Sequence, residues 1–397
     1  MSPLGLDRRG FLGALGVGSV GAMLAGGLPA RPLAGAQARP RKKWQPVSDR
    51  KVRVGIVGYG YCKFGAKFGF QDHPNVEIVA VSDLIADRRA GLMKAVRCEK
   101  SYESLELLVK DPKIEAVFVA TDAPSHARHC IECMKHGKHA MSAVPATFGS
   151  IEDGEKLLEA VTKAGLKYMM AETSCFRPDC YAMRRIYRAG GFGRVVYSEG
   201  EYFHYMAKPL PSYKNWRFGS PPLWYPTHST AYYVGVTGQR FTAVSCGGFK
   251  SGADAFKPGA NKYDNEFTDE VALFQTSEGG TSRMSMCKSV IGYHAEAGRV
   301  FGETGCMNGM KYTGRMKKLP DISRPPLPPG VPGGGHGGSH GPLMDDFVTA
   351  ILEDRQPVVN VHEALAMTVP GIVAHQSALK DGETMKLPQY LPPKAGS

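Results

Sequence analysis

The chain has 397 residues, of which 49 are Lys or Arg and 37 are Asp or Glu, giving a formal net charge of +12 at pH 7. This length allows two domains, and a hydrophobic content of 43% excludes a disordered or collagen-like chain. The basic residues are scattered, with local runs only at 39–43 and 315–318, and no aromatic residues are interleaved with them. Nucleic acid is therefore not an expected partner, whereas an anionic polymer or cell-envelope surface stays open.

The N-terminus carries the pattern of an export signal. Arg8 and Arg9 precede a moderately apolar stretch from Phe11 to Leu28, and the small residues at 36–38 suit cleavage. This predicts a twin-arginine signal peptide at 1–38 and a periplasmic or otherwise extracytoplasmic protein. A membrane anchor is the alternative, but the stretch is at the lower length limit for a spanning helix. Because this route exports folded proteins, a cofactor would be loaded before export and would stay bound.

The chain has nine cysteines, an odd number without a regular spacing. Cys130 and Cys133 form one Cys-x-x-Cys pair, within a predicted helix at 125–136. A zinc ribbon would need a second such pair, so we expect both thiols to be packing residues and predict no metal site.

A dinucleotide-binding turn opens the first domain. Residues 52–57 form a β-rich run typical of a buried parallel strand, and Gly58 and Gly60 follow at once. The first glycine allows a tight turn, and the second lets the backbone approach a pyrophosphate. Lys63 stands where a third glycine is expected, with Gly65 two positions on. That departure implies either a shifted helix or a lysine that points to the phosphates.

A second predicted strand, 76–81, ends just before Asp83, near the usual spacing for an acid that binds the ribose. An acid there favours NAD over NADP, because it would repel a 2′-phosphate. Arg88 and Arg89 nevertheless keep NADP open. The βα alternation continues with a buried strand at 116–120, as expected of a parallel sheet.

We therefore expect an α/β fold of two domains. An N-terminal arm at 39–50 precedes a Rossmann domain at 51–172, and a C-terminal α+β domain at 173–397 serves substrate binding and oligomerisation. Its sheet should be open and mainly antiparallel, and the face that the helices leave bare predicts a homo-oligomer. The predicted strands of this domain are 241–249, 266–276, 280–289 and 298–304, and the helices are 343–352 and 361–379.

These motifs resemble the glucose-fructose oxidoreductase, inositol dehydrogenase and rhizopine-catabolism (Gfo/Idh/MocA) family. Their order and spacing carry the resemblance over nearly the whole mature chain: the glycine turn, Asp83 after its strand, 120–126, the Gly-Lys-His turn at 137–139, Phe347, Ile351, Pro357 and 382–388. The resemblance implies that NAD is contacted by Gly58, Gly60, Tyr61, Asp83, Thr121, His126 and Pro145.

Two departures from the family pattern concern its chemistry. Sugar dehydrogenases of this family carry Glu-Lys-Pro where this chain has Ala143, Val144 and Pro145. Valine carries no charge and moves no proton, so the usual lysine-assisted alcohol oxidation is not expected. The family's Asp-x-x-x-His pair falls on His228 and Tyr232. The departures imply a different chemistry or a lost activity.

The chain also resembles the NAD-dependent glycoside hydrolases, which form one branch of this superfamily, in the segments 169–172, 201–205, 225–228 and 333–338. That resemblance implies a redox-neutral cycle. Hydride leaves sugar carbon C3 for NAD, the C2 proton becomes acidic, the aglycone is eliminated, water adds, and the hydride returns. Such a cycle suits an exported enzyme that cannot exchange its nucleotide.

The same resemblance implies four catalytic residues. Tyr202 or His204 could take the C3 hydroxyl proton, His228 could orient that hydroxyl or act as the base at C2, and Glu172 could bind sugar hydroxyls. Structural roles are the alternative, since Glu172 could cap the following helix. Tyr202 and His204 could equally form one face of a half-buried strand at 194–205.

Five further residues are expected to bind the substrate: Trp216, Arg217, Tyr225, Tyr232 and His336. Aromatic faces suit the C–H side of a pyranose, but they could equally pack their Pro-rich loop against the body of the protein. His336 lies in a Gly- and Pro-rich segment without a nearby carboxylate in sequence, which favours a lid that brings it to the substrate over a metal site.

Two other functions stay open. One is a net sugar oxidoreductase that oxidises one sugar and reduces another with the same bound NAD, although Val144 in place of lysine speaks against it. The other is a carbohydrate-binding protein that keeps its nucleotide for structure alone, which a cluster of His and Tyr at the site makes the weaker expectation.

Overall fold

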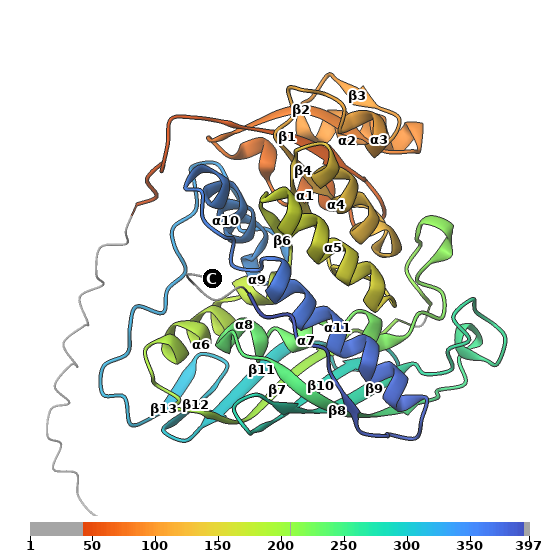
Figure 1. The fold of residues 1–397 in the computed structure, drawn as a ribbon, viewed down its shortest axis with the longest axis vertical. Helices are drawn as coiled ribbons and strands as arrows, with labels where there is room; N and C mark the ends of the chain where they lie inside the picture. Colours follow the sequence, from red (N-terminus) through yellow and green to blue (C-terminus); the bar gives the residue numbers. More distant parts are fainter. Residues whose placement is uncertain (1–42, 207, 393–397) are drawn as a thin grey trace, which may run out of the picture. The chain divides into compact units, whose positions relative to one another are not determined.

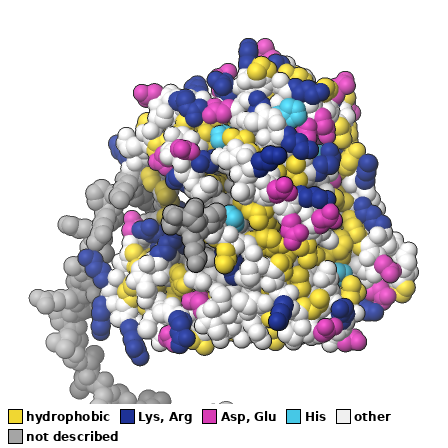
Figure 2. All heavy atoms as spheres, viewed as in Figure 1, with side chains coloured by type: hydrophobic (Ala, Val, Ile, Leu, Met, Phe, Trp, Pro, Cys, Tyr) yellow, Lys and Arg dark blue, Asp and Glu magenta, His cyan; other side chains and the backbone are white. Residues whose placement is uncertain are grey.

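The computed structural model describes residues 43–206 and 208–392, which belong to one compact unit. The predicted signal peptide at 1–38 lies outside the described residues. Within the described ranges, none of the helices combines the length and apolar character needed to cross a membrane. On the face drawn in Figure 2, basic and acidic side chains are interspersed over the described surface.

A six-stranded parallel sheet forms the N-terminal half, in the order β3-β2-β1-β4-β5-β6. This is the predicted Rossmann sheet, and its order reverses between β1 and β4, where such folds bind nucleotides. The strands are β1 (Val52–Val57), β2 (Val76–Ser82), β3 (Ser101–Tyr102), β4 (Ala116–Val119), β5 (His139–Ser142) and β6 (Tyr168–Met170). The helices are α1 (Phe64–Lys67), α2 (Ala86–Val96), α3 (Leu105–Leu108), α4 (His126–Lys135) and α5 (Ile151–Ala164).

The sequence explains why these elements form. All four residues of β4 are buried, as expected for an apolar parallel strand covered on both faces. Helix α5 begins where the Ser150 side chain accepts a hydrogen bond from Asp153 N, and it ends at Gly165, whose φ of 63° is in the left-handed region. The apolar residues of α5, Leu157 and Val161 among them, are buried.

The C-terminal half is built on an eight-stranded sheet, in the order β13-β12-β11-β7-β10-β9-β8-β14. Its strands pair antiparallel except β7 with β10, so the predicted open, mainly antiparallel sheet is confirmed. The strands are β7 (Val195–Phe203), β8 (Phe241–Phe249), β9 (Asp269–Thr276), β10 (Thr281–Cys287), β11 (Ala295–Gly302), β12 (Gly305–Asn308), β13 (Lys311–Gly314) and β14 (Met385–Lys386).

Helices cover one face of this sheet (Figure 1). Helix α11 packs against both β8 and α5 and so connects the two halves. The other face is open: along β9, burial alternates with exposure, and Leu273 is exposed. The homo-oligomer expected over this face stays a prediction. The helices of this half are α6 (Pro178–Arg188), α7 (Thr227–Thr230), α8 (Val234–Thr237), α9 (Gly335–Gly338), α10 (His340–Leu352) and α11 (Val361–Ala378).

Candidate active site

The glycine turn is built for close backbone approach. Gly58 has a φ of 102°, and a Cβ there would come 2.4 Å from Ala120 O. A Cβ on Gly65 would come 2.5 Å from Gly58 O, so Gly65 provides the close contact between helix and strand that the third glycine usually allows. Helix α1 begins only after Lys63. The departure at Lys63 is therefore a shifted helix, and the lysine itself lines the adjoining cavity.

That cavity, of about 170 Å³, lies beside the glycine turn, where this fold binds dinucleotides. Asp83 lies at its edge and accepts hydrogen bonds from Tyr59 N (2.7 Å) and Ile85 N (2.9 Å), which fix its carboxylate. Arg89 donates to the carbonyl of Asp83, whereas Arg88 lines the cavity. Six of the seven residues expected to contact NAD line it: Gly58, Gly60, Tyr61, Asp83, Thr121 and His126.

Pro145, the seventh of these residues, is not part of that cavity wall. Its carbonyl accepts a hydrogen bond from His126 Nδ1 (2.8 Å). Pro145 therefore fixes the ring of His126, which does line the cavity. Sequence order alone could not separate the two roles, because Pro145 directly follows two residues that do line the cavity, Ala143 and Val144.

A second cavity, of about 160 Å³, adjoins the first. Val144 lines both cavities, so the position that carries lysine in the sugar dehydrogenases places an apolar side chain at the junction. The other residues that line both are Cys62, Phe64, Ala143, Trp216, Arg217 and Tyr225. The two cavities are therefore a candidate nucleotide site and a candidate substrate site that share one wall.

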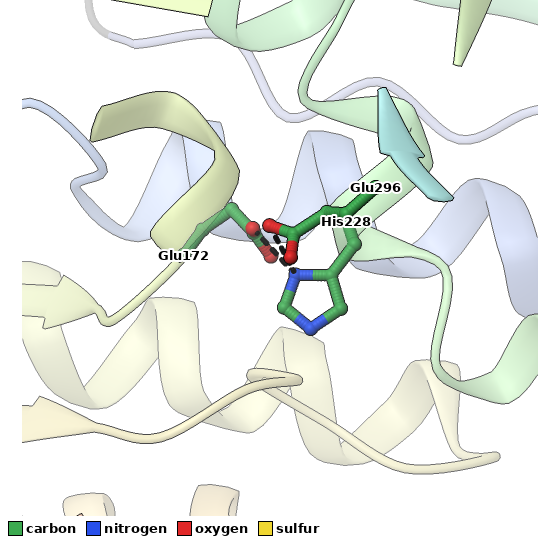
Figure 3. Close-up of side chains that lie close together, drawn as sticks. All are labelled: Glu172, His228 and Glu296. Carbon is green, nitrogen blue, oxygen red and sulfur yellow. Dashed lines mark hydrogen bonds and ion pairs between the residues drawn. The ribbon is translucent and has the colours of Figure 1, made fainter. Parts of the chain in front are cut away.

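His228 points one ring nitrogen, Nδ1, at two carboxylates behind the substrate cavity (Figure 3). Its Nδ1 donates to Glu172 Oε1 (2.8 Å) and lies 3.8 Å from Glu296 Oε1. All three side chains are at least nine-tenths buried. In Figure 3 the other ring nitrogen, Nε2, points away from both carboxylates. Since His228 also lines the cavity, Nε2 is the nitrogen available to a substrate.

The cluster is charged at neutral pH. Burial alone would lower the pKa of His228, but the charges of Glu172 and Glu296 outweigh it and raise that pKa to about 9. Burial would likewise raise the pKa of Glu296, but His228 and His336 lower it to about 2. His228 is thus an imidazolium that can donate a hydrogen bond from Nε2, and a poor base.

Glu172 has the capping role that was the alternative for it and also pairs with His228, but it is fully buried and is not among the residues that line the substrate cavity, so its binding of sugar hydroxyls stays a prediction. Its Oε1 accepts a hydrogen bond from Ser174 N (2.7 Å), which caps the short 3-10 helix Thr173–Phe176, and the same oxygen accepts from His228. The capping alternative is therefore present together with the pairing to His228.

Tyr202 and His204 lie on β7 and its continuation, two residues apart, and both line the substrate cavity. The Tyr202 hydroxyl is 2.9 Å from His204 Nδ1, and its ring centroid is 4.8 Å from that of His228. Burial lowers the pKa of His204, and the nearby His294 and Arg217 lower it further. A neutral His204 can therefore accept the proton of Tyr202.

His336 reaches the cluster from the Gly-rich segment and lines the substrate cavity, whereas the predicted lid movement stays a prediction. Its Nδ1 donates to Glu296 Oε2 (2.8 Å), and its ring stacks on that of His228 at a centroid distance of 5.5 Å. Arg324 fastens this segment by donating to the carbonyls of Gly338 (2.7 Å) and Phe176 (2.9 Å).

Three other residues expected at the substrate, Trp216, Arg217 and Tyr225, line the cavity. Tyr232 does not, and its placement at the site was wrong. Its ring is buried against Gly298, and its hydroxyl donates to Asp179 Oδ2 (3.0 Å). The family's Asp-x-x-x-His pair, which falls on His228 and Tyr232, therefore brings only its first position to the cavity.

Sequence reasoning missed Glu296, because the strand that carries it was predicted to begin at Gly298 and begins at Ala295. The alternation of large and small residues from His294 to Gly298 was the available signal. It also missed Ser174, whose Oγ donates to Glu296 Oε1 (2.6 Å).

Two groups of the described side chains offer atoms that could bind a metal ion. Cys130 and Cys133 are buried free thiols on α4, and burial raises the pKa of both. Glu172, His228 and Glu296 offer ligand atoms within 4.8 Å of one another, and Glu172 Oε2 is buried without a hydrogen-bond partner. A cation there would have to displace the Nδ1 proton that both carboxylates stabilise.

Comparison with known proteins supports the assignment of the nucleotide site. Residues 52–172 match the model of the Gfo/Idh/MocA oxidoreductase family, described as an NAD-binding Rossmann fold. A "Glycosyl hydrolase family 109 protein" of Porphyromonas gingivalis is 30% identical over 178 residues, covering 42% of this chain and 37% of that protein. One of Shewanella amazonensis is 28% identical over 269 residues, covering 61% of this chain and 58% of that protein. The chain thus aligns with less than two thirds of each relative.

Solved structures share the whole fold at low identity. A levoglucosan dehydrogenase in complex with NADH and levoglucosan has a TM-score of 0.71 at 19% identity, covering 86% of this chain and all of that one. A probable dehydrogenase from Thermotoga maritima has a TM-score of 0.68 at 16% identity, covering 84% of this chain and 98% of that one. These structures show that the Rossmann half and the large sheet occur together in other proteins.

Proposed function

We propose that the chain, whose residues 52–172 match the model of the NAD-binding Gfo/Idh/MocA oxidoreductases, cleaves a glycoside without net oxidation. The observation that carries the proposal is the cavity that adjoins the nucleotide site. It combines an apolar Val144 with a cationic His228 and a Tyr202–His204 pair. The names of the sequence relatives point to the same activity.

The cofactor would be held by the glycine turn and Asp83, whose contacts are described above. When bound, NAD supplies a reversible acceptor for the hydride of sugar carbon C3. The apolar Val144 at the junction of the cavities keeps water away from that position.

Tyr202 takes the proton of the C3 hydroxyl and passes its own proton to neutral His204, at 2.9 Å. Burial raises the pKa of Tyr202, so the phenol stays protonated until the substrate hydroxyl approaches it. His228 donates a hydrogen bond from Nε2 to the same substrate oxygen. This bond polarises the C3 carbonyl that forms when hydride leaves. Glu172 and Glu296 keep His228 charged for this task.

The proton at C2 is acidified by the new carbonyl and needs a base. The Nδ1–H group of His336 donates a hydrogen bond to Glu296. The other ring nitrogen, Nε2, is then free to accept a proton, and the ring lines the cavity. When a base removes the C2 proton, a C1–C2 double bond forms and the bond from C1 to the aglycone oxygen breaks. Water then adds at C1, and the base, whose proton has exchanged with solvent, returns a proton to C2. His336 is the candidate base for this step.

A net sugar oxidoreductase is the second candidate function. The similar solved structures favour it, since they include a levoglucosan dehydrogenase in complex with NADH. The position of Val144 opposes it, because no lysine stands at the junction of the cavities.

We also propose that residues 1–38 direct export and that the protein works outside the cytoplasm with a permanently bound cofactor. The twin arginine and the small residues at 36–38 support this. N-terminal sequencing of protein from the periplasm would give a mature chain that starts near Arg39. A start at Met1 in the cytoplasmic fraction would contradict the proposal.

The test of the activity is release of nitrophenol from α- and β-nitrophenyl glycosides by the purified protein without added nucleotide. We expect continued release over many turnovers, with no lasting NADH absorbance. Accumulation of NADH after a single turnover, without nitrophenol, would assign the oxidoreductase instead.

A further inference from the structure

The substrate cavity is lined by cations without a matching carboxylate. Arg217 and Lys288 line it together with His204, His228 and His336, whereas no Asp or Glu is among its lining residues in the described ranges. The carboxylates of the active site, Glu172 and Glu296, lie behind the histidines and are paired with them. The excess of positive charge therefore faces the space that a sugar would occupy.

Lys288 extends into the cavity from the sheet. It follows β10, which runs parallel to β7 with Met286 beside Tyr202, so Lys288 comes two residues, roughly 6.6 Å, past that pair. Its Nζ donates to Ser220 O (3.1 Å) and Ser220 Oγ (3.4 Å). An ammonium has three protons, and the third is left for a ligand.

Arg217 is the second cation. Its guanidinium lies 4.2 Å from the centroid of the Trp216 ring and 5.8 Å from that of Tyr225, so aromatic faces hold its plane in place. No carboxylate lies within ion-pair distance of Arg217 or Lys288 among residues 43–206 and 208–392. A planar guanidinium held in this way can bind an oxyanion through two hydrogen bonds.

The acids nearest to Lys288 are already satisfied. Asp269 Oδ1 accepts from the backbone N–H groups of Lys288 (2.8 Å) and Ser289 (3.0 Å). Glu270 accepts from His375 Nδ1 (2.6 Å) and Leu223 N (2.7 Å). Burial lowers the pKa of Lys288 to about 8 despite the charge of Glu270, as expected for an ammonium that lacks a close counter-ion.

We propose that the substrate is an anionic sugar, whose carboxylate or ester-linked sulfate or phosphate is bound by Lys288 and Arg217. The inference rests on the proposed function, since it assigns a substrate class to the same cavity. An oxyanion there offsets the charges of Lys288 and Arg217 and accepts the third hydrogen bond that the Lys288 ammonium can donate. Because Arg217 also lines the nucleotide cavity, Lys288 is the residue that distinguishes the sugar from the cofactor.

Isothermal titration of the purified, NAD-loaded protein tests this without turnover. The probes are glucuronate, galacturonate, glucose 6-phosphate and glucose 6-sulfate, each against its neutral parent sugar. We expect at least one anion to bind ~10-fold more tightly than its parent, the size of one charged hydrogen bond. Comparison of the uronates with the two esters then identifies which anionic group the site takes.

Three variants assign the effect. Lys288→Met should remove the preference for the anion, Lys288→Arg should largely keep it, and Lys163→Met, an exposed lysine on α5, should leave it unchanged. Equal binding of each anion and its parent by the wild type would overturn the inference, as would an undiminished preference in a folded Lys288→Met variant. Cleavage of neutral glycosides with no preference for anions would leave the proposed function standing and reject this inference alone.

Discussion

The two cavities of this protein share a wall but are built by different means. Several segments line the nucleotide cavity, but its distinguishing feature is the backbone of one short segment, in which Gly58 and Gly65 permit contacts that no other residue allows. The substrate cavity depends on side chains from distant segments, since Glu172, His228, Glu296 and His336 meet only through tertiary packing. The difference teaches that the cofactor can be inferred from a local motif, whereas the chemistry must be inferred from assembled geometry.

The largest expected effect separates the two cavities by function. His228→Asn keeps an N–H for Glu172 but removes the cationic donor at Nε2, so kcat should fall about 10³-fold. The amount of NAD that copurifies should stay unchanged, because His228 does not line the nucleotide cavity. Nitrophenol release and released nucleotide are the two measurements. His136→Asn, at the end of α4 and outside both cavities, is the control. Unaltered kcat in the His228 variant would remove it from the mechanism.

The variant Gly58→Ala tests the nucleotide cavity in the same way. The new Cβ would meet Ala120 O at 2.4 Å in a conformation with positive φ, so the turn must shift and bound NAD should fall about 100-fold in affinity. Nucleotide content after gel filtration measures the loss. Gly247→Ala, where a Cβ meets nothing within 4 Å, should retain full occupancy. Full occupancy in the Gly58 variant would show that the turn does not hold the cofactor.

A smaller effect concerns the charges behind the substrate cavity. The raised pKa of His228 contributes stability that is fully present below pH 6.5 and lost as pH rises through about 9. The lowered pKa of Glu296 contributes stability that is present above pH 4.5 and lost as pH falls through about 2. Glu296→Gln should therefore destabilise the protein by about 2 kcal/mol at pH 6 and by less above pH 9.

Thermal unfolding of Glu296→Gln and of the wild type, each across pH, measures this loss of stability. Glu303→Gln, which removes an exposed ion pair with Arg194, is the control and should show no such dependence on pH. A loss of stability in the Glu296 variant that is the same at pH 6 and pH 10 would mean that His228 is not its partner.

The smallest expected effect is that of removing metal ions, which should change neither turnover nor melting temperature. If protons occupy the Glu172–His228–Glu296 cluster, overnight treatment with a chelator should leave turnover and melting temperature as they were. Loss of activity that added Zn²⁺ or Mn²⁺ restores would identify the cluster as a metal site instead.

The Rossmann half could be predicted from sequence because its signals are local. The strand at 52–57, the glycines after it and Asp83 stand close together, and their spacing alone indicates the turn. At Lys63 the sequence left a shifted helix and a lysine that points to the phosphates as alternatives, and the structure shows the shifted helix together with a Lys63 that lines the cavity.

The substrate half was predicted less completely, for a physical reason. Tyr202, His204 and His228 were named because the chain resembles the NAD-dependent glycoside hydrolases in the segments that carry them. Glu296 was not, because the only local signal was a short alternation of large and small residues, and its role comes from partners 68 and 40 residues away. Tyr232 was named only because the family's Asp-x-x-x-His pair falls on His228 and Tyr232, and the structure buries its side chain away from the cavity.

The most direct test of the account is cleavage of an accepted nitrophenyl glycoside in D₂O, followed by NMR of the released sugar. The account predicts one deuterium at C2 and the original hydrogen at C3, because the C2 proton exchanges with solvent while the hydride returns to its own carbon. Released sugar with hydrogen retained at C2 would contradict redox-neutral elimination and indicate direct displacement at C1.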